Sequence, residues 1–154
     1  MAARAPVADW NDLQPLTRWL AERGRGVSMD DVEQLVEELG ARVLAWFGDE
    51  VDLWITPTVP GLPPRVGAWS ELAPSDAFAA AVELGPFTAP FNVSGLPAAT
   101  VPVAMSASGL PIGVQLVGKS FADALVLSVA RALENALPWR DRPYPFLAAG
   151  AAVR

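Results

Sequence analysis

The sequence predicts an α/β fold in which a partial mixed sheet of about three strands is covered by about four helices. Two observations carry this prediction. Three short apolar segments, at residues 52–56, 98–104 and 112–118, have the composition of strands. Around them, apolar residues recur every three or four positions, as they do on one face of an amphipathic helix. Helices and a sheet in one chain bury their apolar faces against one another, so the two patterns favour helices packed on a sheet.

The first two helices are expected before the first strand. Asn11 is the expected N-cap of one that ends at Gly24, with Pro15 in its first turn, where backbone N–H groups have no helical partner. Ser28 and Asp31 resemble a capping box and begin a second helix of about 19 residues. One apolar stripe predicts its buried face: Val32, Leu35, Val36, Leu39, Val43 and Phe47.

The rest of the chain alternates loops, strands and two more helices. Four prolines in residues 57–64 predict a loop, because proline fits neither a helix interior nor a hydrogen-bonded strand. Residues 77–84 are expected to form a helix capped by Ser75 and Asp76. The two later strands are expected to form an antiparallel hairpin, with Pro102 at an edge or bulge.

The last helix is expected to begin after Ser120 as its cap. Its apolar residues leave little polar face, which predicts a buried helix. A glycine within the last strand, Gly113, indicates close approach of another backbone or of a ligand.

Composition limits the class of protein. Hydrophobic residues make up 52% and charged residues 18% of the chain, where about 25% charged is usual. This balance suits a piece of a larger protein whose inner surfaces are covered, although an alanine- and valine-rich globular domain also fits. We expect one domain at residues 1–146 and a poorly ordered tail at 147–154.

Charge and residue usage exclude several functions. The net charge is −6 and there is one lysine, which argues against a nucleic-acid partner. Without cysteine or histidine, the chain has no disulfide, no thiol nucleophile and no zinc–thiolate site, and we expect no cofactor and no metal. No secretory signal and no membrane-spanning run is recognised, so we expect a cytoplasmic protein without a membrane partner.

The chain offers hydroxyl nucleophiles but little to activate them. Lys119 is the one amine base, and a Ser-x-x-Lys pattern fails because Leu116 stands where the serine would be. A solvated or ion-paired Lys119 is the favoured interpretation. Carboxylates of the second helix are interpreted as a solvated face. The candidate nucleophiles are Thr56, Thr58, Ser94 and Thr100.

Four segments in order resemble the amidase signature family, and together they extend over roughly residues 9–145. Residues 52–60 are similar to its Asp, apolar strand and Thr-Pro-Thr segment. Residues 87–97 are similar to its Phe-Asn-x-x-Gly-x-Pro segment, and residues 109–118 to its Gly-x-Pro-x-Gly-x-Gln strand. The helix over 121–137, with Trp139, Arg142 and Pro143, resembles the family's usual ending.

The resemblance implies hydrolysis of carboxylic amides by a serine nucleophile, a cis serine and a lysine. In the family these residues lie in an N-terminal serine- and glycine-rich stretch, and this chain has no adjacent serines and no lysine before Lys119. No catalytic residue is therefore carried over, whether the chain is an enzyme is left open, and no amide hydrolysis by the chain alone is expected. The resemblance implies contacts near a small amide substrate for Thr56, Thr58, Phe87, Asn92 and Gln115. For Asn92 and Gln115, bonding to local backbone as scaffold is the favoured interpretation, and for Phe87 a core position is an equally open alternative.

Three hypotheses follow from the sequence. The first is the C-terminal portion of an amidase, either truncated or one part of a split enzyme that pairs with an N-terminal half. The second is a non-catalytic interaction module that self-associates or docks onto a catalytic half. The third is a subunit of a glutamine-dependent amidotransferase.

Overall fold

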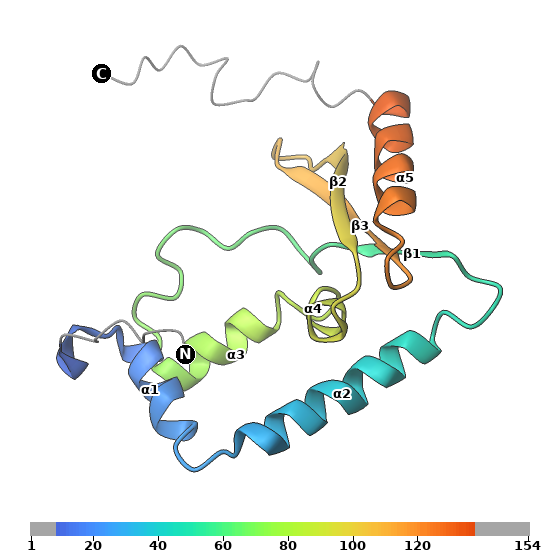
Figure 1. The fold of residues 1–154 in the computed structure, drawn as a ribbon. Coiled ribbons are helices and arrows are strands. Elements are labelled where there is room, and N and C mark those ends of the chain that lie inside the picture. Colours follow the sequence, from blue (N-terminus) through green and yellow to red (C-terminus); the bar gives the residue numbers. More distant parts are fainter. Residues whose placement is uncertain (1–8, 138–154) are drawn as a thin grey trace.

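The computed structural model describes residues 9–137, so the expected tail at 147–154 and the family-like residues from Trp139 onward lie outside it. Five α-helices, one short 3-10 helix and three strands make up this part of the chain (Figure 1). Their bounds are η1 Trp10–Asp12, α1 Pro15–Arg23, α2 Met29–Ala45, β1 Leu53–Pro57, α3 Pro74–Val82, α4 Ala89–Ser94, β2 Ala98–Met105, β3 Pro111–Gly118 and α5 Asp123–Ala136.

The predicted strands and hairpin are confirmed. β3 lies between β1 and β2 and is antiparallel to both, in the order β1-β3-β2. Thr56 and Thr100 both lie opposite Gln115. The register shifts between Pro102 and Ala104, so Pro102 occupies both positions expected for it, an edge strand and a bulge.

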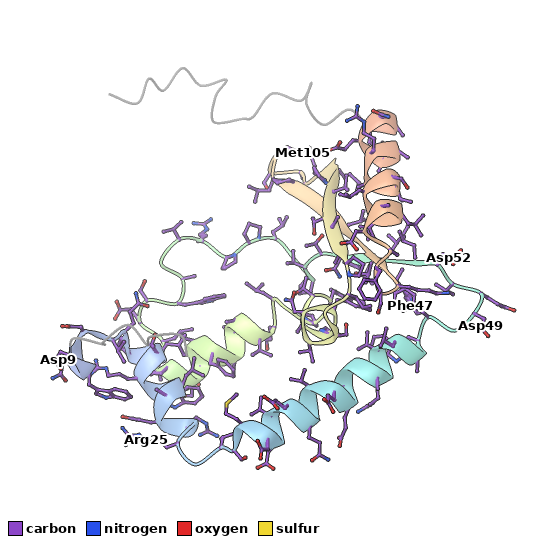
Figure 2. The ribbon with its side chains drawn as sticks, viewed as in Figure 1. Asp9, Arg25, Phe47, Asp49, Asp52 and Met105 are labelled. Atoms are coloured by element: carbon purple, nitrogen blue, oxygen red, sulfur yellow. The ribbon has the colours of Figure 1, made fainter. Side chains whose placement is uncertain are left out.

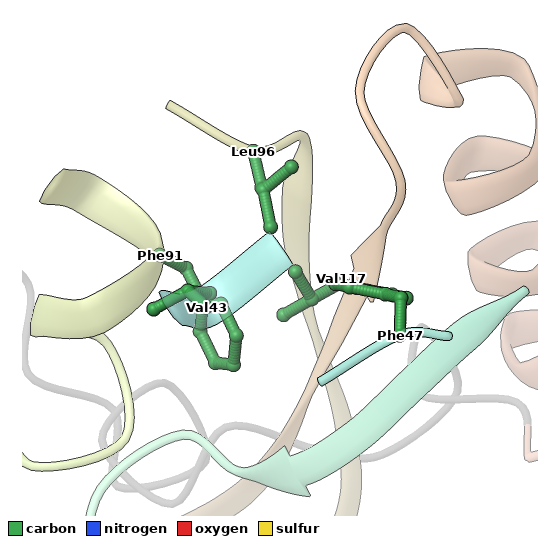
Figure 3. Close-up of a cluster of buried hydrophobic side chains, with 5 residues drawn as sticks. All are labelled: Val43, Phe47, Phe91, Leu96 and Val117. Atoms are coloured by element: carbon green, nitrogen blue, oxygen red, sulfur yellow. The ribbon is translucent and has the colours of Figure 1, made fainter. Parts of the chain in front are cut away.

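Helices cover both faces of the sheet (Figure 1). α5 packs on β2 and β3, where its Val126 joins Val101 and Leu116 in one buried cluster. On the opposite face, Val117 packs with side chains from the end of α2, from α4 and from the segment before β2. The buried members of this second cluster, drawn in Figure 3, are Val43, Phe47, Phe91, Leu96 and Val117.

α1 and α3 form a separate layer away from the sheet. Trp19 of α1 stacks at a tilt against Phe78 of α3, with 5.6 Å between ring centroids. The guanidinium of Arg23 lies 5.0 Å from the centroid of the same Trp19 ring. In Figure 1 the long helix α2 runs from this layer toward the sheet.

Helix starts differ from the expectation. Asp9, not Asn11, caps the first turn, because its carboxylate accepts the Asn11 backbone N–H at 2.9 Å, and α1 begins only at Pro15. Ser28 precedes α2 as predicted, but its side chain makes no capping hydrogen bond. The expected caps before α3 and α5 are wrong, since Ala73 and Ala122 occupy those places.

Two further differences concern the number of helices and the burial of their apolar side chains. α4 adds a fifth helix that the sequence pattern does not predict, and Gly95 ends it with φ 66°, a left-handed conformation that glycine adopts without strain. The expectation of a buried last helix is wrong for α5, of which Val126 alone is buried and Leu127 is 65% exposed. In α2, Val43 is buried while Val32, Leu35 and Val36 of the same stripe are exposed.

Candidate functional site

One face of the sheet is covered by α2 and α4 over half of its extent. A polar cluster lies on the other half of that face. Along β3, Val117, Gln115 and Gly113 point to this same face, because side chains alternate along a strand. Val117 belongs to the apolar cluster of Figure 3. Toward Gly113 the buried apolar side chains give way to hydroxyl and amide groups from all three strands.

Gln115 is at the centre of the polar cluster. Its side chain is 4% exposed, and its Nε2 donates to Phe87 O at 2.8 Å and to Thr56 Oγ1 at 3.1 Å. A carbonyl oxygen only accepts, so the Phe87 contact fixes which end of the amide is nitrogen. Thr56 Oγ1 in turn donates to Pro57 O at 3.1 Å. The chain of bonds ties β3, the end of β1 and the segment before α4 together.

The two remaining hydroxyls lie beside Gly113. Thr58 Oγ1 and Thr100 Oγ1 are 3.4 Å apart. A Cβ on Gly113 would be 2.9 Å from Thr100 Cγ2 and 3.1 Å from Thr58 Oγ1. A close approach to Gly113 is found, but its nearest atoms belong to two threonine side chains, one from β2 and one just after β1, and not to the backbone or ligand that the sequence predicts. The sequence marks Thr100 as a candidate nucleophile and not as a member of this cluster, because the register of β2 cannot be deduced from composition.

The structure brings together three of the five predicted contact residues with their side chains, Thr56, Thr58 and Gln115. Phe87 joins the cluster through its backbone carbonyl. Asn92 lies exposed on α4, and no hydrogen bond joins its side chain to the cluster among residues 9–137. The hydrogen bonds of Gln115 are those of a scaffold residue, and substrate contact by any of the five stays a prediction.

No nucleophile–base pair is formed in the part of the chain that the structure describes. Lys119 Nζ lies 3.7 Å from Asp52 Oδ1, so the amine makes an ion pair at the surface, as the favoured interpretation has it. Ser94 Oγ donates to Phe91 O at 3.2 Å. The three threonines bond to one another, to Gln115 or to backbone. A hydroxyl nucleophile needs a base within hydrogen-bond reach, and none of these has one.

Two hollows flank the sheet. One of about 260 Å³ adjoins the polar cluster at Gly113 and carries no charged side chain in its lining of Val59, Pro60, Gly61, Leu62, Pro111, Ile112 and Gly113. A larger one of about 350 Å³ lies between α2 and α4, is mainly apolar, and includes none of the five predicted residues. The smaller hollow is the one that the polar cluster borders.

Neither a metal-binding cluster nor a membrane span is found in the described residues. Across residues 9–137, no group of three or more His, Cys, Asp or Glu side chains is placed to hold a metal ion. No helix in that range is long and apolar enough to cross a membrane.

Similarity to known proteins agrees with this arrangement. A family model described as Amidase matches residues 14–127. The chain is 37% identical, over 82% of its length, to 28% of the 6-aminohexanoate-cyclic-dimer hydrolase of Paenarthrobacter ureafaciens. It is 36% identical, over 71% of its length, to 21% of a glutamyl-tRNA(Gln) amidotransferase subunit of Granulibacter bethesdensis. The chain thus spans about a quarter of the length of the curated relatives it matches.

The fold is shared as well. A solved structure of 6-aminohexanoate cyclic dimer hydrolase complexed with substrate superposes with a TM-score of 0.79 at 35% identity. The superposition covers 90% of this chain and 31% of that one. The family match extends over most of the chain and the resemblance is to the C-terminal portion of such enzymes. The chain belongs to the amidase family.

Proposed function

We propose that the chain supplies the scaffold and one wall of an amide-hydrolysing site whose nucleophile and base lie outside its 154 residues. The observation that carries this proposal is the polar cluster on an open sheet face, in an amidase-family chain that holds its one lysine in an ion pair with Asp52. The serine, cis serine and lysine that the family resemblance implies would be contributed by the rest of an amidase domain.

The wall is assigned to the end of the sheet beside Gly113. Thr58 Oγ1 donates to Thr100 Oγ1 at 3.4 Å, so Thr58 keeps lone pairs that can accept from a ligand, while Thr100 keeps a hydrogen that it can donate. Gln115, by contrast, uses both amide hydrogens within the protein. We therefore assign to Thr58 a substrate contact in which its hydroxyl oxygen accepts, for example from an amide N–H, and a supporting role to Gln115 and Thr56. Phe87 supports Gln115 through its backbone carbonyl. For Asn92, a substrate contact is proposed on the family resemblance alone.

A small amide is the proposed substrate. The hollow beside Gly113 has an uncharged lining, which favours an uncharged group of the substrate there. The relative with a TM-score of 0.79 has a solved structure complexed with substrate, and its name states a cyclic dimer of 6-aminohexanoate. That dimer is a suitable first probe. A cytoplasmic location stays a prediction.

A second candidate is a role within a glutamine-dependent amidotransferase. It is favoured by the 36% identity to the glutamyl-tRNA(Gln) amidotransferase subunit of Granulibacter bethesdensis. The solved protein of the same name from Thermotoga maritima superposes with a TM-score of 0.54 at 26% identity, against 0.79 at 35% for the cyclic dimer hydrolase. The comparison supports a hydrolase more strongly than an amidotransferase.

Labelling with a serine-reactive fluorophosphonate tests where the nucleophile lies. We expect no covalent adduct on the purified chain by intact-mass spectrometry. The amidase segment that the chain lacks can be taken from the Paenarthrobacter hydrolase, as the part of that enzyme that this chain does not match. With this segment present, the adduct is expected on it alone. An adduct on any serine or threonine of the chain would contradict the proposal.

A further inference from the structure

We propose that the outer edge of β1 is the seam at which an amidase segment outside these 154 residues adds a strand to the sheet, with Phe121 as an anchor beside it. The inference rests on the proposed function, because its occupant is the rest of an amidase domain. Four observations support it: the direction of the β1 backbone groups, the contrast with β2, the conformation of Phe121 and the exposed apolar surface.

The backbone of β1 presents unpaired groups to one side. The N–H of Thr58 donates to Gly113 O at 3.3 Å, toward β3. Since successive residues of a strand direct their N–H and C=O groups to opposite sides, Leu53 and Ile55 direct theirs away from β3. Among residues 9–137, no strand lies on that outer side. An unpaired edge of this kind is a template for another strand.

β2, the other edge strand, is blocked. The N–H of Gly118 donates to Pro97 O at 3.0 Å, so by the same alternation Ala98, Thr100 and Pro102 face outward. Pro102 has no N–H to offer, and the bulge after it breaks the regular spacing. Both features are ways in which proteins prevent strand addition. β1 has no bulge, and its proline is its last residue, Pro57.

Phe121 is exposed in the turn after β3, three residues beyond Gly118, which is paired with the first residue of β1. Its φ of 63° makes it the one non-glycine residue in the described range with a positive φ, and its side chain is 97% exposed. Such a conformation is strained for a residue with a side chain and persists only where the surroundings fix it. Gly118 is paired with Leu53, Lys119 Nζ lies near Asp52, and the Ala122 N–H donates to Lys119 O at 3.0 Å.

The turn that carries Phe121 is thus tied to the first residues of β1. Asp52, at this end of the sheet, lies opposite Met105 at the hairpin end in Figure 2. An aromatic side chain that is almost fully exposed offers apolar surface for a partner to bury, as interface anchors do. Ile55, 59% exposed on the α5 face of β1, adds apolar surface next to the same edge.

The size of the relatives identifies the occupant. The chain covers 31% of the solved hydrolase, so more than two thirds of that protein lies outside the matched part and is available to cover an equivalent of this surface. In the described residues, eight hydrophobic side chains are buried and twenty large ones are exposed. A single domain of this length would cover more of them. A second copy of the chain would bring the same exposed surface again, so an amidase segment is the better occupant.

Affinity capture tests the seam. The tagged, unmatched part of the Paenarthrobacter hydrolase is co-expressed with the untagged full chain, and the dissociation constant of the purified pair is measured. Ile55→Pro removes an outward N–H from β1, and Ala98→Pro is the matched control on β2. Phe121→Gly removes the anchor and relieves the strain of positive φ. Circular dichroism and thermal melts of each free variant check folding.

We expect capture of the wild-type chain, binding at least about tenfold weaker for Ile55→Pro, and wild-type binding for Ala98→Pro, a tenfold change being about 1.4 kcal/mol. Phe121→Gly should weaken capture without lowering the melting temperature of the free chain. Absence of capture, or equal loss from both proline variants, would overturn the seam. If the chain forms homodimers that Ile55→Pro disrupts, the partner at this edge is a second copy of the chain and not an amidase segment. Capture through β1 without amide hydrolysis would contradict the proposed function and leave the seam standing.

Discussion

At the scale of single residues, Gln115 and Gly113 explain how three strands converge on one polar cluster. Gln115 is nearly fully buried and satisfies two acceptors that come from different parts of the chain, Thr56 Oγ1 and Phe87 O. Gly113 leaves room for the two threonine side chains that approach it. Neither residue is assigned a reacting group. Both hold the wall in place.

Replacing Gln115 by leucine is expected to destabilise the chain by about 1–3 kcal/mol, because the partly buried Phe87 carbonyl loses its donor. Gln115→Glu should be at least as harmful, since a carboxylate would face that carbonyl. Urea unfolding of the full chain measures both. Asn92→Leu, at an exposed position, is the control and should stay within about 0.5 kcal/mol of wild type. A Gln115→Leu chain as stable as wild type would show that the hydrogen bonds by which Gln115 links the three segments are dispensable.

Gly113→Ala is expected to cost about 1–3 kcal/mol, because the added Cβ would lie 2.9 Å from Thr100 Cγ2. Thr100→Ser removes that methyl group, so the double variant should recover part of the loss. Gly61→Ala is the control, as no atom lies within 4 Å of a Cβ at that glycine. A double-mutant cycle by urea unfolding measures the coupling. Additive single effects would mean that the clash with Thr100 is absent.

At the scale of elements, α2 shows most clearly how packing differs along one helix. Its C-terminal part contributes Val43 to the cluster of Figure 3, and Phe47 follows just after the helix ends. Its N-terminal part leaves Leu35 and Val36 exposed. Gly40, near the point of contact with α4, is buried although it is inside a helix, where glycine is unfavourable.

Gly40→Ala is expected to stabilise the chain by about 0.5–1 kcal/mol, since alanine has the higher helix propensity. The added Cβ would lie 3.7 Å from Ser94 Cα of α4, an ordinary contact distance. Gly40→Val carries two further methyl groups into this contact and should destabilise instead. Thermal unfolding followed by circular dichroism distinguishes the two. Destabilisation by alanine would indicate tighter α2–α4 packing than the structure has.

The comparison of sequence and structure is best made element by element. The strands and the hairpin were predictable because proline, glycine and apolar runs act locally. α4 was not, because six residues with Pro90 inside them carry no helical period. The prediction that the last helix is buried was wrong. An apolar pattern indicates which side chains could be buried, but not whether another element is present to cover them. Gln115 and Thr56 could be named singly, but their contact depends on strand pairing between distant segments.

At the scale of the whole molecule, the chain has the elements of an amidase and covers them incompletely. It spans about a quarter of its curated relatives, and much of its apolar surface is exposed along α2, at Phe121 and near the β1 edge. The polar cluster lies on the open half of the sheet face, beside the hollow at Gly113. These features agree with the proposal that further amidase residues pack on this surface and complete the site.

Thr58→Val is expected to raise the KM of the completed enzyme about three- to tenfold with kcat nearly unchanged, if Thr58 contacts bound substrate and not the reacting atoms. Val27→Ala, an exposed change in the turn between α1 and α2, is the control and should alter neither constant. Steady-state kinetics on the captured complex gives both values. A loss confined to kcat would assign Thr58 to the chemical step.

The central claim is that this chain completes an amide-hydrolysing site but does not contain its reacting groups. The direct test of this claim is hydrolysis of the 6-aminohexanoate cyclic dimer, monitored through the appearance of the linear product. Three samples are compared: the pure chain, the unmatched part of the Paenarthrobacter hydrolase, and the two together. We predict turnover by the combined sample alone. Turnover by the pure chain that a serine reagent abolishes, or a captured complex without turnover, would contradict it.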